Sequence, residues 1–186
     1  RLLYAVTPRF APTSSEEQLL KAKQLLEEHP DVYMHTHLSE NKAEIEWVKE
    51  LFPKSDSYLG VYQDHGLVRK RSVFAHCIHL EDKDFKCLSD HEASISFCAT
   101  SNMFLGSGFF KLDKANQHKV RVGLGTDIGA GTSFCHLQTM NESYKIIKQQ
   151  KSLVDDPKSI HPLTSVQAFY LATLGGAKSL HLEDKL

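Results

Sequence analysis

Five short apolar runs of the sequence each lead into side chains that could do chemistry. They lead, in order, into Arg9-Phe10, His37 with Glu40, His76, Thr100-Ser101-Asn102, and Asp127. Imidazole nitrogens and carboxylate oxygens bind Zn²⁺, so His37, His76 and Asp127 are candidates to surround one ion. Glu40 lies three residues after His37, where a carboxylate can reach a metal-bound water without binding the metal. These residue types predict metal-assisted hydrolysis.

Several of these residues also have plainer interpretations. A single His-x-x-Glu is a weak metal motif, and Arg9 could be an ordinary solvated arginine. His35 fits a hydrogen-bonded core histidine, while Ser39 and Asn41 fit helix caps. Gly106 and Gly108 fit turn positions. Seven further histidines are predicted to be surface or supporting residues in loops and helices: His65, His79, His91, His118, His136, His161 and His181.

The elements that must position these residues alternate along the chain. Strands are predicted over residues 2–6, 32–37, 73–77, 95–99 and 120–124. Between them, Ser14 with Glu17 and Asn41 with Glu44 have the spacing of helix capping boxes. Apolar side chains at helical spacing predict four buried helix faces. They are Leu19-Ala22-Leu25-Leu26, Ile45-Val48-Phe52, Leu137-Met140-Tyr144-Ile147 and Val166-Phe169-Tyr170.

Alternating strands and helices predict an α/β fold with parallel strands and right-handed crossovers. Such a fold is either an open doubly wound sheet or part of a (β/α)8 TIM-type barrel. No Gly-rich phosphate loop follows a strand, which favours the barrel. Reacting residues sit at the C-terminal strand ends in both folds. His35 and His37 are predicted to share a face, as are Gly123, Gly125 and Asp127, with the glycines leaving room above the barrel interior.

Composition limits the class of protein. The 186 residues, 41% of them hydrophobic, predict one domain over residues 1–186. A net charge of -1 without a long basic run excludes a non-specific nucleic-acid binder. No apolar run approaches the roughly 18–20 residues that span a membrane. The four cysteines match neither a zinc motif nor a disulfide framework, so we expect a reducing, cytoplasmic location.

Read together, the motifs resemble the guanine deaminases, a family of the amidohydrolase superfamily. The resemblance covers nearly the whole chain, and the matching stretches occur in the family's order. They are Thr7-Pro8-Arg9-Phe10, His37-Leu38-Ser39-Glu40-Asn41, Ala75-His76, Thr100-Ser101-Asn102, Gly123-Leu124-Gly125-Thr126-Asp127 and Ala172-Thr173-Leu174-Gly175-Gly176. The zinc deaminases that act on cytidine use Pro-Cys-x-x-Cys instead, and the sequence lacks that motif.

The resemblance implies an activity and a role for each residue. The activity is hydrolytic deamination of guanine to xanthine and ammonia by a zinc-bound hydroxide, in purine catabolism. His37 and Asp127 would bind one Zn²⁺, although iron or manganese suits the same donors. Asp127 would also act as a base, Glu40 would shuttle protons, and His76 would hold the hydroxide or the substrate. The implied substrate-binding residues are Arg9, Phe10, His37, Leu38, Ser39, Glu40 and Asp127, with Asn102 completing the rim.

The sequence also departs from the family pattern. The family takes two further zinc ligands from a His-x-His pair on its first strand, and no such pair precedes Arg9. Because Arg1 runs directly into apolar residues and the chain stops at Leu186, we expect a fragment covering barrel strands four to eight. It would lack the first strands and a C-terminal β-rich region. We expect these residues alone to be inactive, and the full-length protein to be a homodimer.

Two other interpretations stay open at this stage. A related amidohydrolase could act on a different aminated ring, such as a nucleoside, cytosine or a triazine. A metal-free relative could instead keep the barrel as a scaffold for partners. The scaffold interpretation predicts the loss of His37, Glu40 or Asp127, and all three are present.

Overall fold

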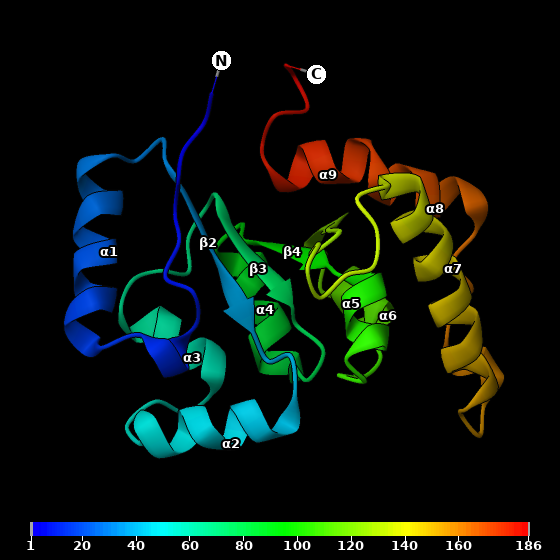
Figure 1. Ribbon diagram of the computed structural model, residues 1–186, viewed down its shortest axis with the longest axis horizontal. Helices are drawn as coiled ribbons and strands as arrows, with labels where there is room; N and C mark the ends of the chain where they lie inside the picture. The colour runs from blue at the N-terminus through cyan, green and yellow to red at the C-terminus, as the bar shows by residue number, and fades with distance from the viewer. Residues whose placement is uncertain (1, 186) are drawn as a thin grey trace.

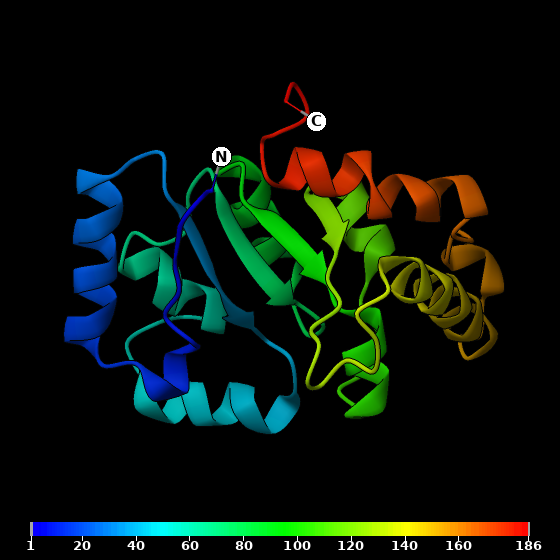
Figure 2. The same cartoon turned by 45° about the horizontal axis from the view of Figure 1, so that its top comes forward.

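The centre of the computed structural model, which describes residues 2–185, is a five-stranded parallel sheet. Its strands are β1 (Ala5–Val6), β2 (Tyr33–Leu38), β3 (Ser72–His76), β4 (Ser94–Phe97) and β5 (Arg121–Leu124). They lie side by side in sequence order, β1-β2-β3-β4-β5, and point in one direction (Figure 2). A doubly wound sheet reverses its order part-way, whereas a barrel does not. The sheet is therefore of the barrel type.

Helices connect the strands and pack around the sheet. They are η1 (Ala11–Thr13), α1 (Glu16–Glu28), α2 (Lys42–Leu51), α3 (Tyr58–Asp64), α4 (Asp82–Asp90), α5 (Ala99–Phe104), α6 (Leu112–Gln117), α7 (His136–Ser152), η2 (Pro157–Ser159), α8 (Ser165–Ala172) and α9 (Leu174–Ser179). In Figure 1, α1 lies along one side of the sheet, and α7 and α8 lie along the other. The α2 helix lies beyond the arrowhead of β2.

The two faces of the sheet differ in burial, as alternation predicts. One face carries Met34, Phe74, Ile95 and Val122, which belong to a single hydrophobic core with the surrounding helices. The opposite face carries His35, which is exposed, and Arg121, which is partly so. Apolar burial of the first face fixes the register, because a slip by one residue would turn it outward.

Helix caps agree with the sequence in one place and differ in another. Asn41 caps α2 and forms a capping box with Glu44, as predicted. The cap of α1 is Ser15, whose side chain accepts a hydrogen bond from N of Gln18, so the predicted cap at Ser14 is wrong. The hydroxyl of Ser14 donates instead to the carbonyl of Phe10 at 2.9 Å, because Ser14 still belongs to the preceding turn.

The predicted helix faces are right in the first half of the chain and only partly right in the last third, where Ile147 is buried as predicted and Met140 packs against the core. Leu19, Ala22 and Leu26 are buried in α1, although Leu25 is exposed. In α2 the buried apolar residue is Val48, and Phe52, which directly follows the helix, is buried beside it. In α7 and α8 several predicted core residues are exposed, because smaller side chains make the contacts. The exposed ones are Leu137, Val166, Phe169 and Tyr170, and the buried ones are Thr139, Ser143, Ile146, Ile147, Ala168 and Leu171.

The last helix, α9, packs against β5. A Cβ atom on Gly123 would lie 2.9 Å from the Cα of Gly176, so only glycine lets the two backbones approach this closely. A Cβ on Gly125 would collide with Oγ of Ser96. The prediction that these glycines leave open space is therefore wrong, since neighbouring atoms occupy it. The hydroxyl of Tyr33 donates to the carbonyl of Leu180 and joins the end of α9 to β2.

Within residues 2–185, no helix combines the length and apolar character that a membrane crossing requires. All four cysteines are free thiols, and Cys77 and Cys98 are buried. Burial raises the pKa of the Cys98 thiol to about 12, so this side chain is a neutral core residue at physiological pH.

Candidate metal and catalytic site

Three strand ends bring metal-binding side chains to one point. His37 lies near the end of β2, His76 ends β3, and Asp127 follows β5. One ligand atom from each of these residues lies within 4.8 Å of the others. Zn²⁺ sits about 2.0–2.2 Å from nitrogen and oxygen ligands, so ligand atoms around one ion are roughly 3–4 Å apart. The cluster therefore fits a divalent metal after a small contraction.

Both imidazole rings are oriented for this role by a hydrogen bond at the other ring nitrogen. Nδ1 of His37 donates to the carbonyl of Arg9 at 2.7 Å, and Nδ1 of His76 donates to Oδ1 of Asn102 at 2.9 Å. In a neutral ring this leaves Nε2 with a free lone pair, the usual arrangement of metal-binding histidines. Nε2 of His76 is buried and has no hydrogen-bond partner within residues 2–185. A buried orphan acceptor of this kind points to a missing ligand.

Two carboxylates complete the cluster. Oε2 of Glu40 lies 3.8 Å from Nε2 of His76, and Oδ2 of Asp127 lies 4.0 Å from the same atom. These distances exceed a hydrogen bond and leave room for a small ion or a water between the groups. The arrangement can hold a positive charge and also accept protons from a water at the same place.

His76 reaches the cluster through an unusual backbone. Strict alternation would place it on the same face as Phe74, in the hydrophobic core. Its φ is 70°, in the left-handed region, and its ring stacks on that of His37 with centroids 5.3 Å apart. Ser39 and Asp127 also have positive φ values, 50° and 48°. Such residues cost of order 1–3 kcal/mol each and cluster at functional sites, so three of them here support a functional role for this end of the sheet.

Glu40 is held from the β4–β5 side of the sheet. Oγ of Ser107 donates to Oε1 of Glu40 at 3.2 Å. Nε2 of His79 in turn lies 3.0 Å from the carbonyl of Ser107 and donates to it. Gly106 and Gly108 flank Ser107 with φ values of 68° and 126°, which confirms their prediction as turn residues. This turn presents Ser107 to the carboxylate.

An aromatic and cationic surface adjoins His37. The Phe10 ring meets the rings of His37 and Trp47 edge-on, with centroids 6.1 and 6.4 Å away. The Arg9 guanidinium lies over Phe10, 5.5 Å from the ring centre. Arg9 is exposed, and Phe10 is half-buried. A planar, polar ring could stack and hydrogen-bond here.

Most of the predicted site residues come together, with two exceptions. His37, Glu40, His76 and Asp127 form the cluster, and Asn102 supports it through His76. The Leu38 side chain lies in the hydrophobic core, and Ser39 is buried, with its carbonyl accepting hydrogen bonds from N of Ile78 and N of His79. Their side chains do not line the cluster.

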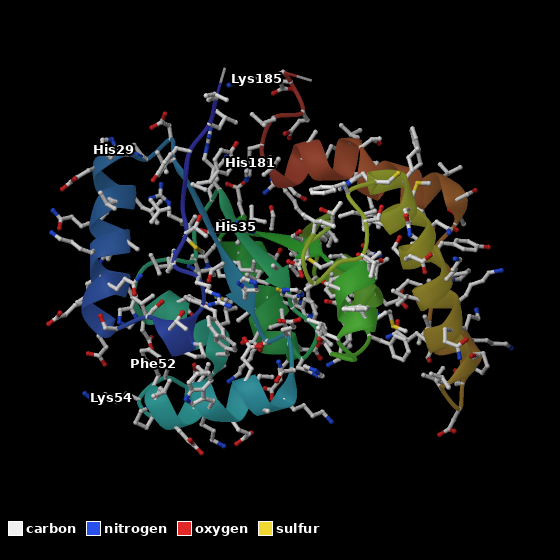
Figure 3. The ribbon with its side chains drawn as sticks, in the orientation of Figure 1. His29, His35, Phe52, Lys54, His181 and Lys185 are labelled. Atoms are coloured by element: carbon white, nitrogen blue, oxygen red, sulfur yellow. The ribbon has the colours of Figure 1, made fainter. Side chains whose placement is uncertain are left out.

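His35 differs from its prediction as a hydrogen-bonded core residue. It lies on β2 (Figure 3), exposed on the open face of the sheet, and makes no side-chain hydrogen bond within the described chain. The predicted core position is wrong because the face that His35 occupies is not covered by the described residues.

Two supporting residues could not be found from local motifs. Ser107 contacts Glu40 across 67 residues of sequence, and Tyr62 bonds to residues 25 and 51 positions away. The Gly-Ser-Gly turn was the only signal for Ser107. A tyrosine within a helix gives no signal of its own.

Comparison with known proteins agrees with this geometry. The profile of the amidohydrolase family matches residues 1–186. The chain belongs to the amidohydrolase family. Its sheet is part of an amidohydrolase β/α barrel, and its sequence resemblance to guanine deaminases is confirmed by specific relatives.

Three relatives illustrate the similarity. The guanine deaminase of Escherichia coli (strain K12) is 59% identical over 184 residues, which are 99% of this chain and 40% of that protein. The crystal structure of guanine deaminase from Bradyrhizobium japonicum is 38% identical with a TM-score of 0.94, covering 99% of this chain and 42% of that one. The C. acetobutylicum enzyme, solved with guanine bound in its active site, is 33% identical with a TM-score of 0.85, over 93% of this chain and 41% of its own. The chain thus spans about 40% of the length of the Escherichia coli guanine deaminase.

Proposed function

We propose that the full-length protein containing this chain hydrolyses guanine to xanthine and ammonia, with one Zn²⁺ bound by His37 and Asp127 beside His76. The convergence of these ligand atoms within 4.8 Å carries the proposal. The 59% identity to a guanine deaminase and the Arg9-Phe10 surface beside His37 support guanine as the substrate. Histidine and aspartate are donors that suit zinc, and iron or manganese would suit them as well.

Each side chain has a chemical task in this reaction. A bound Zn²⁺ lowers the pKa of a water from about 15.7 toward about 7. Asp127 accepts the proton that the attacking water loses. Glu40 delivers a proton to the ring nitrogen beside C2 as the C–O bond forms there. The C2–N bond then breaks as Asp127 passes its proton to the amino group, which leaves as ammonia. The proton of the added hydroxyl returns to Glu40, and the oxygen remains on xanthine as a carbonyl.

Recognition of the ring is assigned to the first strand end. The Arg9 guanidinium is a planar fork of donors that suits the carbonyl of guanine. Adenine carries an amino group there, so a donor would meet a donor, and an unmatched buried partner costs about 1–3 kcal/mol. Phe10 and its neighbours offer an aromatic surface to the flat ring. We assign His76, whose lone pair faces the cluster, to holding the attacking water or the substrate.

The test is a substrate panel on the full-length protein. We expect ammonia from guanine, and little from adenine, adenosine, cytosine or an amino-triazine. Activity on another ring alone would reject guanine and leave the chemistry in place. No hydrolysis of any ring by metal-loaded protein would favour the scaffold interpretation instead.

A variant pair tests the residue roles. We expect Glu40→Gln to keep its metal while hydrolysis falls by about 10²–10⁴-fold, the usual contribution of general acid–base catalysis. Glu46→Gln, an exposed neighbour on α2, is the matched control and should retain activity. Metal analysis of both proteins separates loss of metal from loss of proton transfer. Unchanged rates in Glu40→Gln would remove Glu40 from its role.

Three expectations from the sequence stay predictions. They are the cytoplasmic location, the homodimer, and inactivity of residues 1–186 on their own. The free thiols of Cys77 and Cys98 support a reducing compartment. Sedimentation of the full-length protein checks the dimer, and an ammonia assay on the isolated chain checks the inactivity.

A further inference from the structure

Tyr62 lies outside the cluster, yet its hydroxyl reaches the place where the turn after β1 meets the end of β2. The side chain belongs to α3 and is fully buried. Its Oη accepts a hydrogen bond from N of Ala11 at 2.9 Å and donates to the carbonyl of His37 at 3.0 Å. One hydroxyl therefore joins a residue of the Arg9–Phe10 turn to a candidate metal ligand.

The same junction is reinforced at the other end of the turn. Oγ1 of Thr36 donates to the carbonyl of Arg9 at 3.1 Å and lies 3.2 Å from Oη of Tyr62. Nδ1 of His37 donates to the same carbonyl at 2.7 Å. The backbone of Arg9 and that of Ala11 are thus both tied to β2, so the side chains of Arg9 and Phe10 project from a segment fixed on each side.

The environment of Tyr62 keeps its hydroxyl in place and protonated. Its ring stacks on Tyr58 and packs against Phe74, with both centroid distances 5.7 Å. Burial raises the pKa of Tyr62 to about 12, so the group remains a hydrogen-bond donor at neutral pH. A buried tyrosine with this many partners is rigid, as a positioning group must be.

We propose that Tyr62 is a positioning residue whose hydroxyl sets the purine-binding turn, Arg9–Phe10, relative to the metal ligand His37. This inference rests on the proposed function for the role of the turn in binding guanine. The expected effect of Tyr62 on metal binding by His37 does not depend on the substrate. Removal of the hydroxyl would leave N of Ala11 and the carbonyl of His37 without this partner. It would thereby loosen the turn, whose Arg9 carbonyl orients the His37 ring. Displacements of about 1 Å at such a site can cost 10²-fold in rate.

The experiment compares Tyr62→Phe with Tyr58→Phe in the full-length, metal-loaded protein. Tyr58 is the matched control because it lies on the same helix, is buried, and its hydroxyl makes no hydrogen bond to the Arg9–Ala11 segment or to β2 within residues 2–185. In Tyr62→Phe we expect the KM for guanine to rise about tenfold, with a smaller change in kcat, as for the loss of one or two buried hydrogen bonds. We also expect release of the metal to a chelator to be about tenfold faster, the lower end for lost supporting contacts. Tyr58→Phe should change neither.

The two readouts separate the possible failures. Equal KM and equal metal release in the two variants would overturn the inference, because a purely structural tyrosine would shift only the melting temperature. If the parent protein does not act on guanine, the proposed function fails, and metal release alone decides the inference. If Tyr62→Phe does not fold, Thr36→Val decides it, since this change removes the bond to the Arg9 carbonyl and should move both readouts in the same direction.

Discussion

Nδ1 of His76 and Oδ1 of Asn102 lie 2.9 Å apart, both side chains being buried. The amide oxygen can only accept, so it fixes the hydrogen of a neutral His76 on Nδ1. Nε2 then points its lone pair at the space shared by Glu40 and Asp127. A residue of α5 thereby controls which nitrogen of His76 is available for chemistry.

Asn102→Ala should lower kcat by about 10–100-fold, because loss of a group that orients a histidine at a metal site has effects of this size. The ring would be free to rotate and to place its hydrogen on Nε2. Asn102→Asp keeps an acceptor for Nδ1 and should recover most of the activity. Steady-state kinetics of the two variants checks this; equal losses would show that the acceptor is not what matters.

Ser107→Ala should lower kcat. The variant removes the hydroxyl that donates to Oε1 of Glu40, and hydrogen bonds to charged groups contribute about 1.5–3 kcal/mol. We therefore expect kcat to fall by roughly tenfold or more, since 1.4 kcal/mol is a factor of ten. Ser152→Ala, whose hydroxyl bonds only within α7, is the control. A parent-like kcat in Ser107→Ala would contradict the role given to Ser107.

The free energy of unfolding should fall as the pH drops below about 6.5, the ordinary histidine value. Burial lowers the pKa of His79, while its hydrogen bond to the carbonyl of Ser107 acts weakly in the opposite direction. The unfolded chain therefore binds this proton first, and stability rises with pH across the interval between the two pKa values. His79→Gln should show a shallower dependence between pH 5 and 7 in denaturant titrations. A slope equal to that of the parent would rule out a contribution from His79.

Gly123→Ala should destabilise the protein by about 1–3 kcal/mol, the usual effect of overpacking. The added Cβ would lie 2.9 Å from the Cα of Gly176, and neither backbone can move aside easily. The reciprocal change Gly176→Ala is the matched control. There the Cβ would meet only the carbonyl of Leu171 at 3.8 Å, so alanine should be neutral or stabilising by up to about 1 kcal/mol. Thermal unfolding compares the two, and equal melting temperatures would contradict the prediction.

The cluster was predictable from the sequence where chemistry follows the strand order. His37 and Asp127 are placed by the rule that reacting residues follow parallel strands. His76 was assigned by the same rule, although its left-handed backbone, which turns the ring toward His37, has no local signal. The cap at Asn41 was predictable because both partners lie within four residues.

What the sequence did not predict depends on contacts between distant segments. Ser107 and Tyr62 act through partners far along the chain, so no short sequence motif contains both partners of these hydrogen bonds. The face of α8 was misassigned because large apolar side chains such as Val166 were expected inside, while Ala168 and Leu171 make the buried contacts. Periodicity finds an apolar stripe but does not determine which neighbour will cover it.

The uninterrupted order of the strands has a consequence for how the polypeptide is built. Each strand after β1 pairs with the strand that precedes it in the sequence, which is the strand synthesised just before it. As the nascent chain emerges, each arriving strand finds its template already in place, which keeps loop-closure entropy small at every addition. Contacts of the last residues, such as the hydrogen bond between Tyr33 and Leu180, 147 positions apart, must await the end of this segment. The sheet can therefore form strand by strand from β1 to β5, and α9 then packs against β5.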